Sequence, residues 1–382
     1  MSKAPETVGL KVVKTKVYKN PSDQDIKVLG QVLREGGLVA IPTETVYGLA
    51  ANGLDAEAMG RIYEAKGRPS DNPLILHVVS KDQVAPLVTQ VPPLAQKLMD
   101  TFWPGPLTIT LPKSDFVPDR ATGGLDRVAL RCPDHDLARA IIRAAGVPLA
   151  APSANLSGRP SPTSGQAVLH DMDSRIEALV DAGPCSIGVE STVVEVHDDQ
   201  LIILRPGGIT ETMLKEVTPH VVYDKHLLGA NEAPKAPGMK YKHYAPDAEM
   251  TTYVGSDQDI VRAMVTKINN ILEETRQDRS LSLGLLIRED LLEAIQEGLK
   301  GDGEELDHAE YSPYEDEGLD LEIIPLTYKD PVDLAHTFYQ DLLDFNEAGV
   351  DYILAQGLLE EGLGLAIMNR MNKASAGRII KL

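Results

Sequence analysis

Cysteine is scarce in this 382-residue sequence, which contains only Cys132 and Cys185. Neither residue belongs to a CxxC pair or to a Cys/His cluster with the spacing of metal ligands. A disulfide framework needs several paired cysteines, and a structural zinc site needs clustered thiolates and imidazoles. The sequence therefore argues against both and suits a reducing, cytoplasmic environment.

Long apolar runs are also missing. No stretch approaches the roughly 18 apolar residues of a transmembrane helix, so we expect no membrane partner. The N-terminal MSKAPETVGLKVVK lacks the apolar core of a secretory signal.

Aromatic residues make up only 4% of the chain, while hydrophobic residues make up 43% and charged residues 25%. This composition is typical of a globular protein, and the length predicts two or three domains packed mainly by aliphatic side chains.

Several motifs with well-defined chemistry are absent. The sequence has no GxxxxGK[ST], no HExxH, no GxSxG and no EF-hand loop. These absences argue against a P-loop NTPase, a zincin, an α/β-hydrolase and an EF-hand calcium protein.

Basic residues are scarce in the second half of the chain. The net charge is −20, and residues 246–382 hold 11 Lys and Arg against 29 Asp and Glu. Residues 1–245 hold 26 against 28 and are almost neutral. Because an acidic surface repels phosphate backbones, direct tRNA binding by the second half is not expected. The first half can still carry a local basic patch.

The first half alternates short apolar runs with amphipathic ones. The apolar runs predict strands at 38–42, 73–79, 106–112, 128–133 and 148–153. Apolar residues recurring every three or four positions predict helices at 55–66, 92–101 and 135–145. Segment 189–205 predicts a hairpin with its turn at HDDQ. We expect an α/β domain with a mixed sheet over residues 1–229.

Residues 230–246, ANEAPKAPGMKYKHYAP, show no apolar periodicity. Their prolines and glycine predict an interdomain linker. Met239, Tyr241, His243 and Tyr244 crowd into six residues of it. A solvated spacer needs no tyrosines, so this linker is also expected to contact a ligand or another part of the chain.

Residues 247–382 show a more regular rhythm. Apolar runs predict strands at 250–254, 283–287, 321–327 and 351–358. Helical patterns lie at 257–275, 289–299, 331–346 and 365–375. This alternation predicts a smaller, Rossmann-like domain with a parallel sheet. It lacks GxGxxG after its first strand, so dinucleotide binding is not supported, and the acidic run 301–320 is interpreted as a solvated loop.

Two polar clusters lie in the first half. In PTETVYGLA, Thr43 and Thr45 follow a strand, either lining a pocket or forming a cap or turn. In KGRPSDNPLILHV, Lys66, Arg68 and Asn72 form a plausible phosphate grip on a turn held by prolines. The alternative is a pair of cations favoured by a helix C-terminus. His77 either faces a polar cleft or is a core histidine.

Three further segments add polar groups. Arg131 ends an apolar strand, so it needs an anionic partner from the protein or from a substrate. The segment APSANLSGRPSPT offers small residues, hydroxyls and an amide, and Ser191 and Arg205 flank a hairpin. Together these clusters fit the binding and orientation of anions better than acid/base hydrolysis.

Seven motifs occur in one order: PTETVYGL, KGRPSDNPLILHV, FWPGPLT, APSANLSGRPSPT, ESTVV, LRPGG and APGMKYKHYAP. The whole chain resembles the Sua5/YrdC/YciO family in its two-domain form. The resemblance implies an open twisted YrdC-like sheet around a concave cleft, followed by a Sua5 domain. It also implies a nucleotidyltransferase, L-threonylcarbamoyladenylate synthase, which condenses L-threonine, bicarbonate and ATP to threonylcarbamoyl-AMP and pyrophosphate. The product serves the t6A modification of tRNA at adenosine 37.

The resemblance also implies roles for individual residues. Lys66 and Arg68 become the catalytic candidates, because they would neutralise the phosphates. The ATP-binding candidates are Lys66, Arg68, Asn72, Arg127, Ser153, Ser161, Arg205 and Tyr241, with Tyr244 as the alternative lid tyrosine. The threonine-binding candidates are Thr43, Thr45, His77, Arg131, Ala151 and Ser191. Mg²⁺ would be held by the ATP phosphates rather than by protein side chains, and the product would pass to a separate transferase.

Two alternatives remain at this stage, and a third is argued against by the cysteine count. YrdC-like domains resemble double-stranded RNA binders, so the chain can be an RNA-binding module without synthase activity. A carbamoyl-transfer enzyme of the hydrogenase-maturation type would need Cys-rich zinc motifs, which two cysteines cannot supply. The Sua5 domain can also act purely as a structural clamp on the lid.

Overall fold

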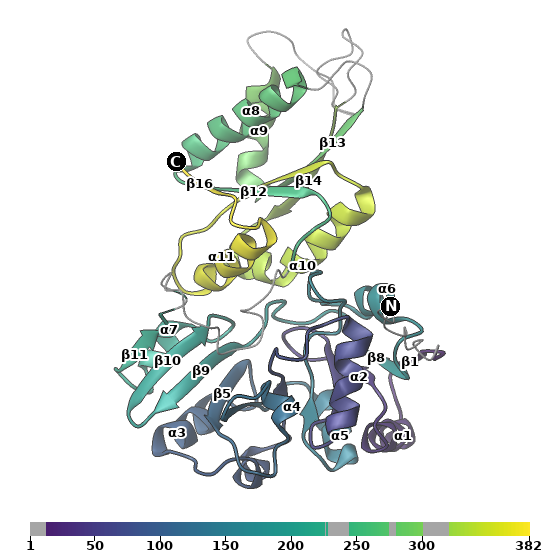
Figure 1. The fold of residues 1–382 in the computed structure, drawn as a ribbon. Coiled ribbons are helices and arrows are strands. Elements are labelled where there is room, and N and C mark those ends of the chain that lie inside the picture. Colours follow the sequence, from purple (N-terminus) through teal and green to yellow (C-terminus); the bar gives the residue numbers. More distant parts are fainter. Residues whose placement is uncertain (1–12, 226, 228–243, 275–279, 301–320) are drawn as a thin grey trace, which may run out of the picture. The chain divides into compact units, whose positions relative to one another are not determined.

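A computed structural model describes residues 13–225, 227, 244–274, 280–300 and 321–382. The chain divides into two compact units (Figure 1). The first comprises Met1–Ser157, Ser161–Ser186 and Glu190–Lys240, and the second comprises Tyr241–Leu382 with Gly158–Pro160 and Ile187–Val189.

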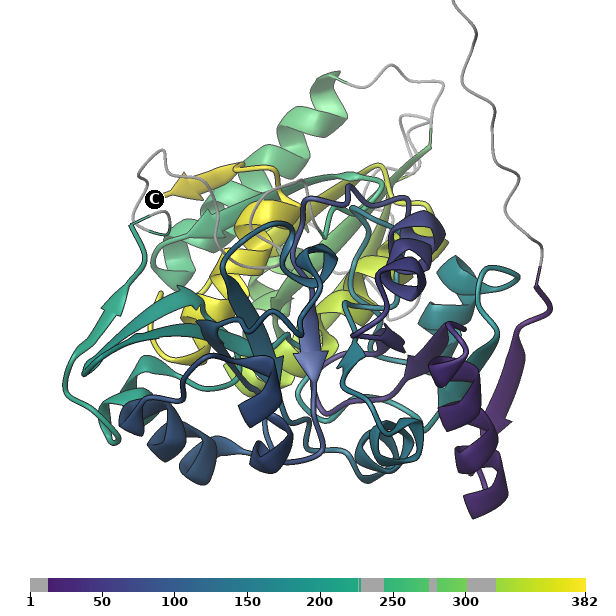
Figure 2. The same ribbon diagram turned by 60° about the horizontal axis from the view of Figure 1, so that its bottom comes forward.

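The first unit is built on a mixed sheet. Its described strands are β1 (Lys16–Lys19), β2 (Val39–Ile41), β3 (Gly48–Asn52), β4 (Ile75–His77), β5 (Leu107–Pro112), β6 (Arg127–Arg131), β7 (Leu149–Ala150), β8 (Ala178–Asp181), β9 (Thr192–His197), β10 (Gln200–Arg205) and β11 (Val221–Tyr223). They lie in the order β1-β8-β2-β3-β7-β4-β6-β5-β9-β10-β11. In Figure 2 the purple β1 and the teal β9 to β11 lie at opposite sides of this unit.

Helices of the first unit carry ordinary start and stop signals. They are α1 (Asp23–Arg34), α2 (Ala56–Lys66), α3 (Pro93–Phe102), α4 (Asp119–Thr122), α5 (Asp136–Ala145), α6 (Gly165–Met172) and α7 (Glu211–Lys215), with 3-10 turns η1 (Lys81–Gln83) and η2 (Ala85–Leu87). Asp55 caps α2 by accepting from the backbone of Glu57 and Ala58. The helix ends at Gly67, whose φ of 59° is the left-handed conformation that glycine adopts without strain.

Strand pairing confirms the predicted mixed α/β domain. β4 and β6 are parallel, β5 is antiparallel to β6, and the hairpin of β9 and β10 turns where the sequence predicted. The sequence patterns did not predict β1, β8 and β11, nor did they predict β3, which Gly48–Asn52 form between β2 and β7. Its small residues have low strand propensity, and its neighbours in the sheet override that preference.

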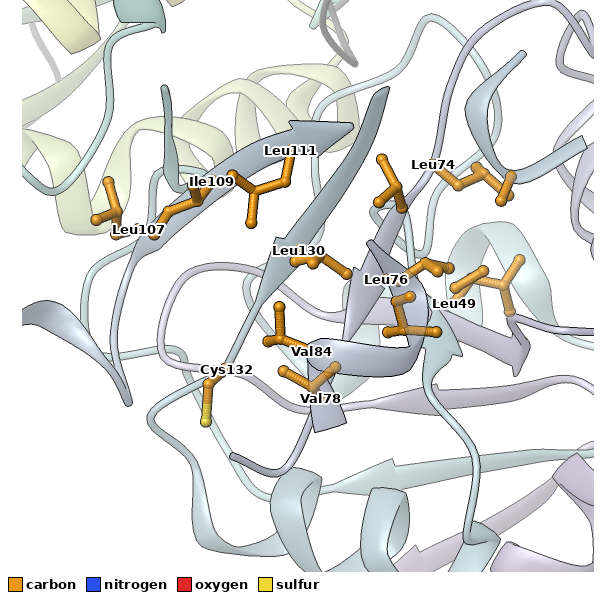
Figure 3. Packing of buried hydrophobic residues seen from close by; sticks show 14 of the residues in the cluster. Leu49, Leu74, Leu76, Val78, Val84, Leu107, Ile109, Leu111, Leu130 and Cys132 are labelled. Carbon is orange, nitrogen blue, oxygen red and sulfur yellow. The ribbon is translucent and has the colours of Figure 1, made fainter. Parts of the chain in front are cut away.

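Alternation along the central strands separates an apolar face from a polar one. Leu107, Ile109 and Leu111 of β5 pack into the main core, together with Leu76 and Leu130 of the neighbouring strands (Figure 3). Burying each leucine stabilises the fold by roughly 1.5–3 kcal/mol. The intervening residues point to the other face, because successive strand side chains alternate. Those residues are His77, Thr108, Thr110, Arg127, Ala129 and Arg131.

The second unit is a three-layer α/β domain. Its strands are β12 (Glu249–Val254), β13 (Leu281–Arg288), β14 (Leu321–Tyr328), β15 (Tyr352–Gln356) and β16 (Ile379–Lys381). Its helices are α8 (Asp257–Glu274), α9 (Leu292–Lys300), α10 (Pro331–Ala348) and α11 (Leu363–Ala374), with η3 (Glu289–Leu291). Figure 1 shows α8 and α9 on one side of the sheet and α10 and α11 on the other.

All pairings in the second sheet are parallel, which confirms the predicted parallel sheet. The order is β14-β13-β15-β12-β16. β15 therefore lies between β12 and β13, unlike the order of the dinucleotide-binding Rossmann sheet. The C-terminal residues Ile379–Lys381 add a fifth strand beside β12.

Most of the predicted linker lies outside the described residues, which resume at Tyr244. The proposed boundaries at residues 229 and 247 stay predictions, and the division into units falls at Lys240 and Tyr241. Within the described ranges, no helix is both long enough and apolar enough to cross a bilayer.

Candidate active site

Two loops with predicted site residues are joined by backbone hydrogen bonds. Gly48 and Ser153 form an antiparallel bridge. The Leu49 N–H donates to the Pro152 carbonyl at 2.7 Å, and the Ala154 N–H donates to the Tyr47 carbonyl at 2.9 Å. The PTETVYGL and APSANLS motifs, about 100 residues apart in the sequence, therefore form one surface.

The PTET loop is a compact, buried turn. The Thr43 hydroxyl donates to the Val46 carbonyl at 2.6 Å and lies 2.9 Å from the Thr45 hydroxyl. It also accepts from the N–H groups of Thr45 and Val46. Thr43 thus stabilises the turn, while Thr45 needs its hydroxyl for only one contact within the loop.

Arg131 already has an anionic partner in the protein. Its guanidinium lies 2.7 Å from the Glu44 carboxylate, and both side chains are 5% exposed. The two groups form an ion pair, but their geometry does not meet the criteria for a hydrogen bond. Arg131 also donates to the Gly105 carbonyl at 3.4 Å. The sequence left open whether a protein acid or a substrate carboxylate would meet Arg131, and Glu44 fills the first of these roles.

His77 is paired with Arg131 across the parallel strands β4 and β6. Burial lowers the pKa of His77 to about 3, and the Arg131 charge contributes to the shift. Its Nδ1 lies 3.3 Å from the Ile75 carbonyl. His77 is therefore a neutral imidazole at physiological pH, suited to hydrogen bonding and not to carrying a charge.

Lys66 is the last residue of α2 and is buried. Its ammonium donates to the carbonyls of Ser153 and Asn155, the latter at 2.6 Å. Burial lowers the pKa of Lys66 well below its ordinary value, and the neighbouring Arg68 charge lowers it further. An anion close to Lys66 would relieve both effects.

Asn72 is the most informative side chain of the predicted phosphate grip. It is 1% exposed, and neither its amide nitrogen nor its amide oxygen has a hydrogen-bond partner among the described residues. The guanidinium of Arg68 donates to the nearby Pro73 carbonyl at 3.2 Å. A buried amide without partners is unfavourable in a folded protein and points to a ligand.

A second group of predicted residues gathers around Ser191. Arg205 donates to the Ser191 carbonyl at 2.9 Å and to its hydroxyl at 3.2 Å. The Ser191 hydroxyl lies 2.8 Å from that of Thr108. Ser161 donates to the Glu190 carboxylate at 2.8 Å. The hairpin and the APSANLSGRPSPT loop are thereby linked next to the polar face of β5.

Three further predicted residues have other surroundings. The Arg127 side chain donates to the Thr110 and Val196 carbonyls at 2.8 and 3.0 Å, so it supports the sheet at the other end of β6 from Arg131. The Ala151 N–H donates to the Ile75 carbonyl, which leaves its own carbonyl for any ligand contact. Tyr241 lies outside the described residues.

Sequence reasoning assigned no role to four polar residues that the structure places among the predicted ones. They are Glu44, Thr108, Asn155 and Glu190. All four lie within the motifs quoted above, and this position in a motif is the feature of the sequence that could have identified them.

The residue inventory limits the chemistry. Burial raises the pKa of Cys132 to about 11 and that of Cys185 to about 12, so neither is an activated thiolate. Within the described ranges, no group of three or more His, Cys, Asp and Glu side chains is placed to hold a metal ion. The site offers cations, hydroxyls and amides that can orient charged reactants.

Family models match both halves of the chain. Residues 31–207 match the Sua5_yciO_yrdC model, described as "Telomere recombination". Residues 209–376 match a model described as "Threonylcarbamoyl-AMP synthase, C-terminal domain".

Relatives match over nearly the whole length. A Bacillus subtilis threonylcarbamoyl-AMP synthase is 44% identical, and the match covers 94% of this chain and 95% of the relative. A Pyrococcus abyssi protein of the same name is 42% identical over 94% of this chain and 96% of the relative. The crystal structure of P. abyssi Sua5 complexed with L-threonine matches with a TM-score of 0.82 and 40% identity, covering 96% of this chain and 99% of that chain.

Proposed function

The chain belongs to the Sua5/YrdC/YciO family in its two-domain form, and on this premise we propose that it is a threonylcarbamoyl-AMP synthase that binds L-threonine. The observation that carries the proposal is the match of both units to the threonine-bound Sua5 structure at 40% identity. The similarity to curated synthases over 94% of the chain supports the same conclusion.

The proposed reaction has two steps. The amine of threonine adds to carbon dioxide derived from bicarbonate and loses a proton, which gives a carbamate. A carbamate oxygen then attacks the α-phosphorus of ATP, the bond to the β-phosphate breaks, and pyrophosphate leaves. The product is threonylcarbamoyl-AMP, so the enzyme is a nucleotidyltransferase. The carbamate is itself the nucleophile, so the reaction needs no activated serine or cysteine, in keeping with the raised thiol pKa values.

Threonine recognition is assigned to the polar face around β4 and β6. Arg131 would bind the substrate carboxylate with guanidinium N–H groups that do not face Glu44, since a guanidinium has five donors. Neutral His77 would hydrogen-bond the substrate without adding charge. Thr45, Ser191 and the Ala151 carbonyl would surround the rest of the amino acid, while Thr43 holds the turn.

ATP recognition is assigned to the end of α2 and the loops beside it. Lys66 and Arg68 would neutralise the triphosphate, and the Asn72 amide, which meets no partner in the described part of the chain, would orient it. Ser153, Ser161 and Arg205 would complete the nucleotide site, with the backbone near Arg127. Tyr241, or Tyr244, would cover the nucleotide from the linker. Two repelling anions would thereby be held in line for attack.

We also propose that Mg²⁺ accompanies ATP, held mainly by the phosphates as in many nucleotide enzymes. The donor set fits this, because the Asn72 amide oxygen is a buried oxygen ligand that has no hydrogen-bond partner among the described residues. When bound, the ion would neutralise phosphate charge. The product would pass in the cytoplasm to a transferase acting on tRNA.

Pyrophosphate release from ATP by the purified protein tests the proposal. Threonine and bicarbonate are each supplied or omitted, and serine replaces threonine in a further reaction. We expect release only when both substrates are present, and we expect serine to be a poor substitute. No release in any combination would favour the RNA-binding alternative.

A further inference from the structure

The second unit contains a cavity of about 620 Å³, to which the proposed synthase reaction assigns no role. It lies at the carboxyl ends of β12, β13, β14 and β15 and is lined by the loops that follow them. Ligands of open α/β sheets bind at this edge, where successive loops diverge. The volume is in the range of sites for small organic molecules.

Tyr328 places an unused hydrogen-bond donor at this cavity. It ends β14, lines the cavity and is 1% exposed. Its hydroxyl has no hydrogen-bond partner among the described residues. Burial raises the pKa of the Tyr328 hydroxyl, so the group keeps its proton. A buried hydroxyl that donates to nothing is unfavourable, and an acceptor on a ligand would satisfy it.

Two exposed apolar side chains lie at or beside the cavity. Leu359 lines it and is 77% exposed, and Val332, next to the lining residue Pro331, is 68% exposed. These are the two most exposed large hydrophobic residues in the described part of the chain. A flat, apolar ring seated against them would remove that surface from water.

The backbone at this edge of the cavity is closely packed. Gly357 follows β15, and a Cβ there would lie 2.5 Å from the Val254 side chain, so packing against β12 requires glycine at this position. The next helix, α11, begins after Gly362 with no side chain capping its first N–H groups, and Gly364 of its first turn lines the cavity. The Gly364 N–H already donates to the Glu361 carbonyl at 2.9 Å, so this turn is closed by the backbone and the Tyr328 hydroxyl is the donor left for a ligand.

The charges of the lining argue against a polyphosphate. Arg288 is neutralised by Asp257 and Asp290, at 2.7 and 2.5 Å. The remaining charged side chains that line the cavity are Lys329, Asp330 and Glu361. The lining is therefore net negative, and it would repel phosphate groups. Carboxylates accept hydrogen bonds from hydroxyl groups, as they do from ribose in nucleotide-binding folds.

We propose that this cavity is a second ligand site, which binds a nucleoside: an apolar ring against Leu359, an acceptor at the Tyr328 hydroxyl, and sugar hydroxyls at the carboxylates. The site lies wholly in the second unit, so the proposal does not depend on synthase activity in the first.

Adenosine is the probe for the test. Equilibrium dialysis with the full chain compares adenosine, AMP and ATP for the wild type and for Tyr328→Phe. Tyr352→Phe is the matched control, because Tyr352 begins β15 at the opposite edge of the sheet. We expect saturable adenosine binding that weakens about 5-fold in Tyr328→Phe, the effect of one neutral hydrogen bond. The control should bind like the wild type.

A charge-reversal variant tests whether the acidic lining disfavours phosphate. Glu361 is exposed, so Glu361→Lys should fold normally and should improve AMP binding relative to adenosine. The proposal is overturned if no saturable adenosine binding occurs, if Tyr328→Phe and wild type bind equally, or if AMP binds the second site more tightly than adenosine. Pyrophosphate release, measured on the same preparations, separates these outcomes from a failure of the synthase proposal.

Discussion

The carboxylate of Glu44, in the loop that connects β2 and β3, lies 2.7 Å from the guanidinium of Arg131 at the end of β6, and both side chains are buried. Each charge would be costly there without the other. Glu44 thereby fixes the position of the cation proposed to meet the threonine carboxylate. It is a positioning residue, and its contribution to stability can be measured without any substrate.

Glu44→Gln should lower the free energy of unfolding by about 3 kcal/mol, because it leaves the Arg131 charge buried without its counter-ion. Urea denaturation followed by fluorescence or circular dichroism measures this. Asp136→Asn is the control, since Asp136 pairs with Arg139 but has a side chain that is 98% exposed, and it should cost no more than about 1 kcal/mol. If both variants lose the same free energy of unfolding, the buried Glu44–Arg131 pair contributes no more to stability than an exposed pair does.

Asn72→Leu should separate activity from stability. The Asn72 amide has no partner among the described residues, so removing it should leave the unfolding midpoint unchanged or slightly raised. Synthase activity should fall by about 10- to 100-fold, or roughly 1.4–2.7 kcal/mol, if the amide orients the triphosphate. In the contrasting variant Asn155→Leu, stability should fall as well, because Asn155 donates to the Leu156 carbonyl at 2.8 Å. A stable, fully active Asn72→Leu enzyme would remove Asn72 from the nucleotide site.

Nucleotide binding should be coupled to proton uptake by Lys66. Burial and Arg68 lower the pKa of Lys66 in the free protein, whereas bound phosphates would raise it. The complex then holds more protons than the free protein, so ATP affinity should fall as the pH rises between the two pKa values.

Calorimetry in two buffers with different ionisation enthalpies measures this uptake directly. Lys66→Met should abolish it, and the exposed Lys81, which pairs with Asp100, gives the control Lys81→Met. Uptake that persists unchanged in Lys66→Met would assign the proton to another group.

His77 should contribute to acid sensitivity of the fold. The pKa of His77 is lowered to about 3, while an unfolded histidine titrates near pH 6.5. Below about pH 6.5 the unfolded chain binds a proton that the folded chain does not, so stability falls with decreasing pH by about 1.4 kcal/mol per unit. In His77→Gln the slope of stability between pH 4 and pH 6, about the window set by these pKa values, should be correspondingly shallower. A slope identical to that of the wild type would show that His77 titrates normally.

Much of the architecture could be predicted because local patterns agree with the fold. The apolar alternation of β5 and the repeated strand–helix rhythm after residue 246 led directly to a mixed sheet and a parallel sheet. The strand Gly48–Asn52 could not be predicted, because its register depends on neighbours far away in the sequence.

Only part of the candidate site could be predicted from the sequence. Polar residues at element ends, such as Lys66 and Arg131, could be found from their position beside apolar runs. Their partners could not, because Glu44 and Arg131 are 87 residues apart in the sequence and only the tertiary fold brings them together. The same limit applies to the Ser191 hydroxyl and Thr108.

Transfer of label from ¹³C-bicarbonate would show directly whether the protein makes threonylcarbamoyl-AMP. The purified protein is incubated with ATP, threonine and labelled bicarbonate, and the adenylate product is analysed by mass spectrometry. We expect a threonylcarbamoyl-AMP that carries one labelled carbon and that is absent when threonine is omitted. Formation of AMP without any labelled adduct, or pyrophosphate release that does not depend on threonine, would contradict the proposed synthase activity.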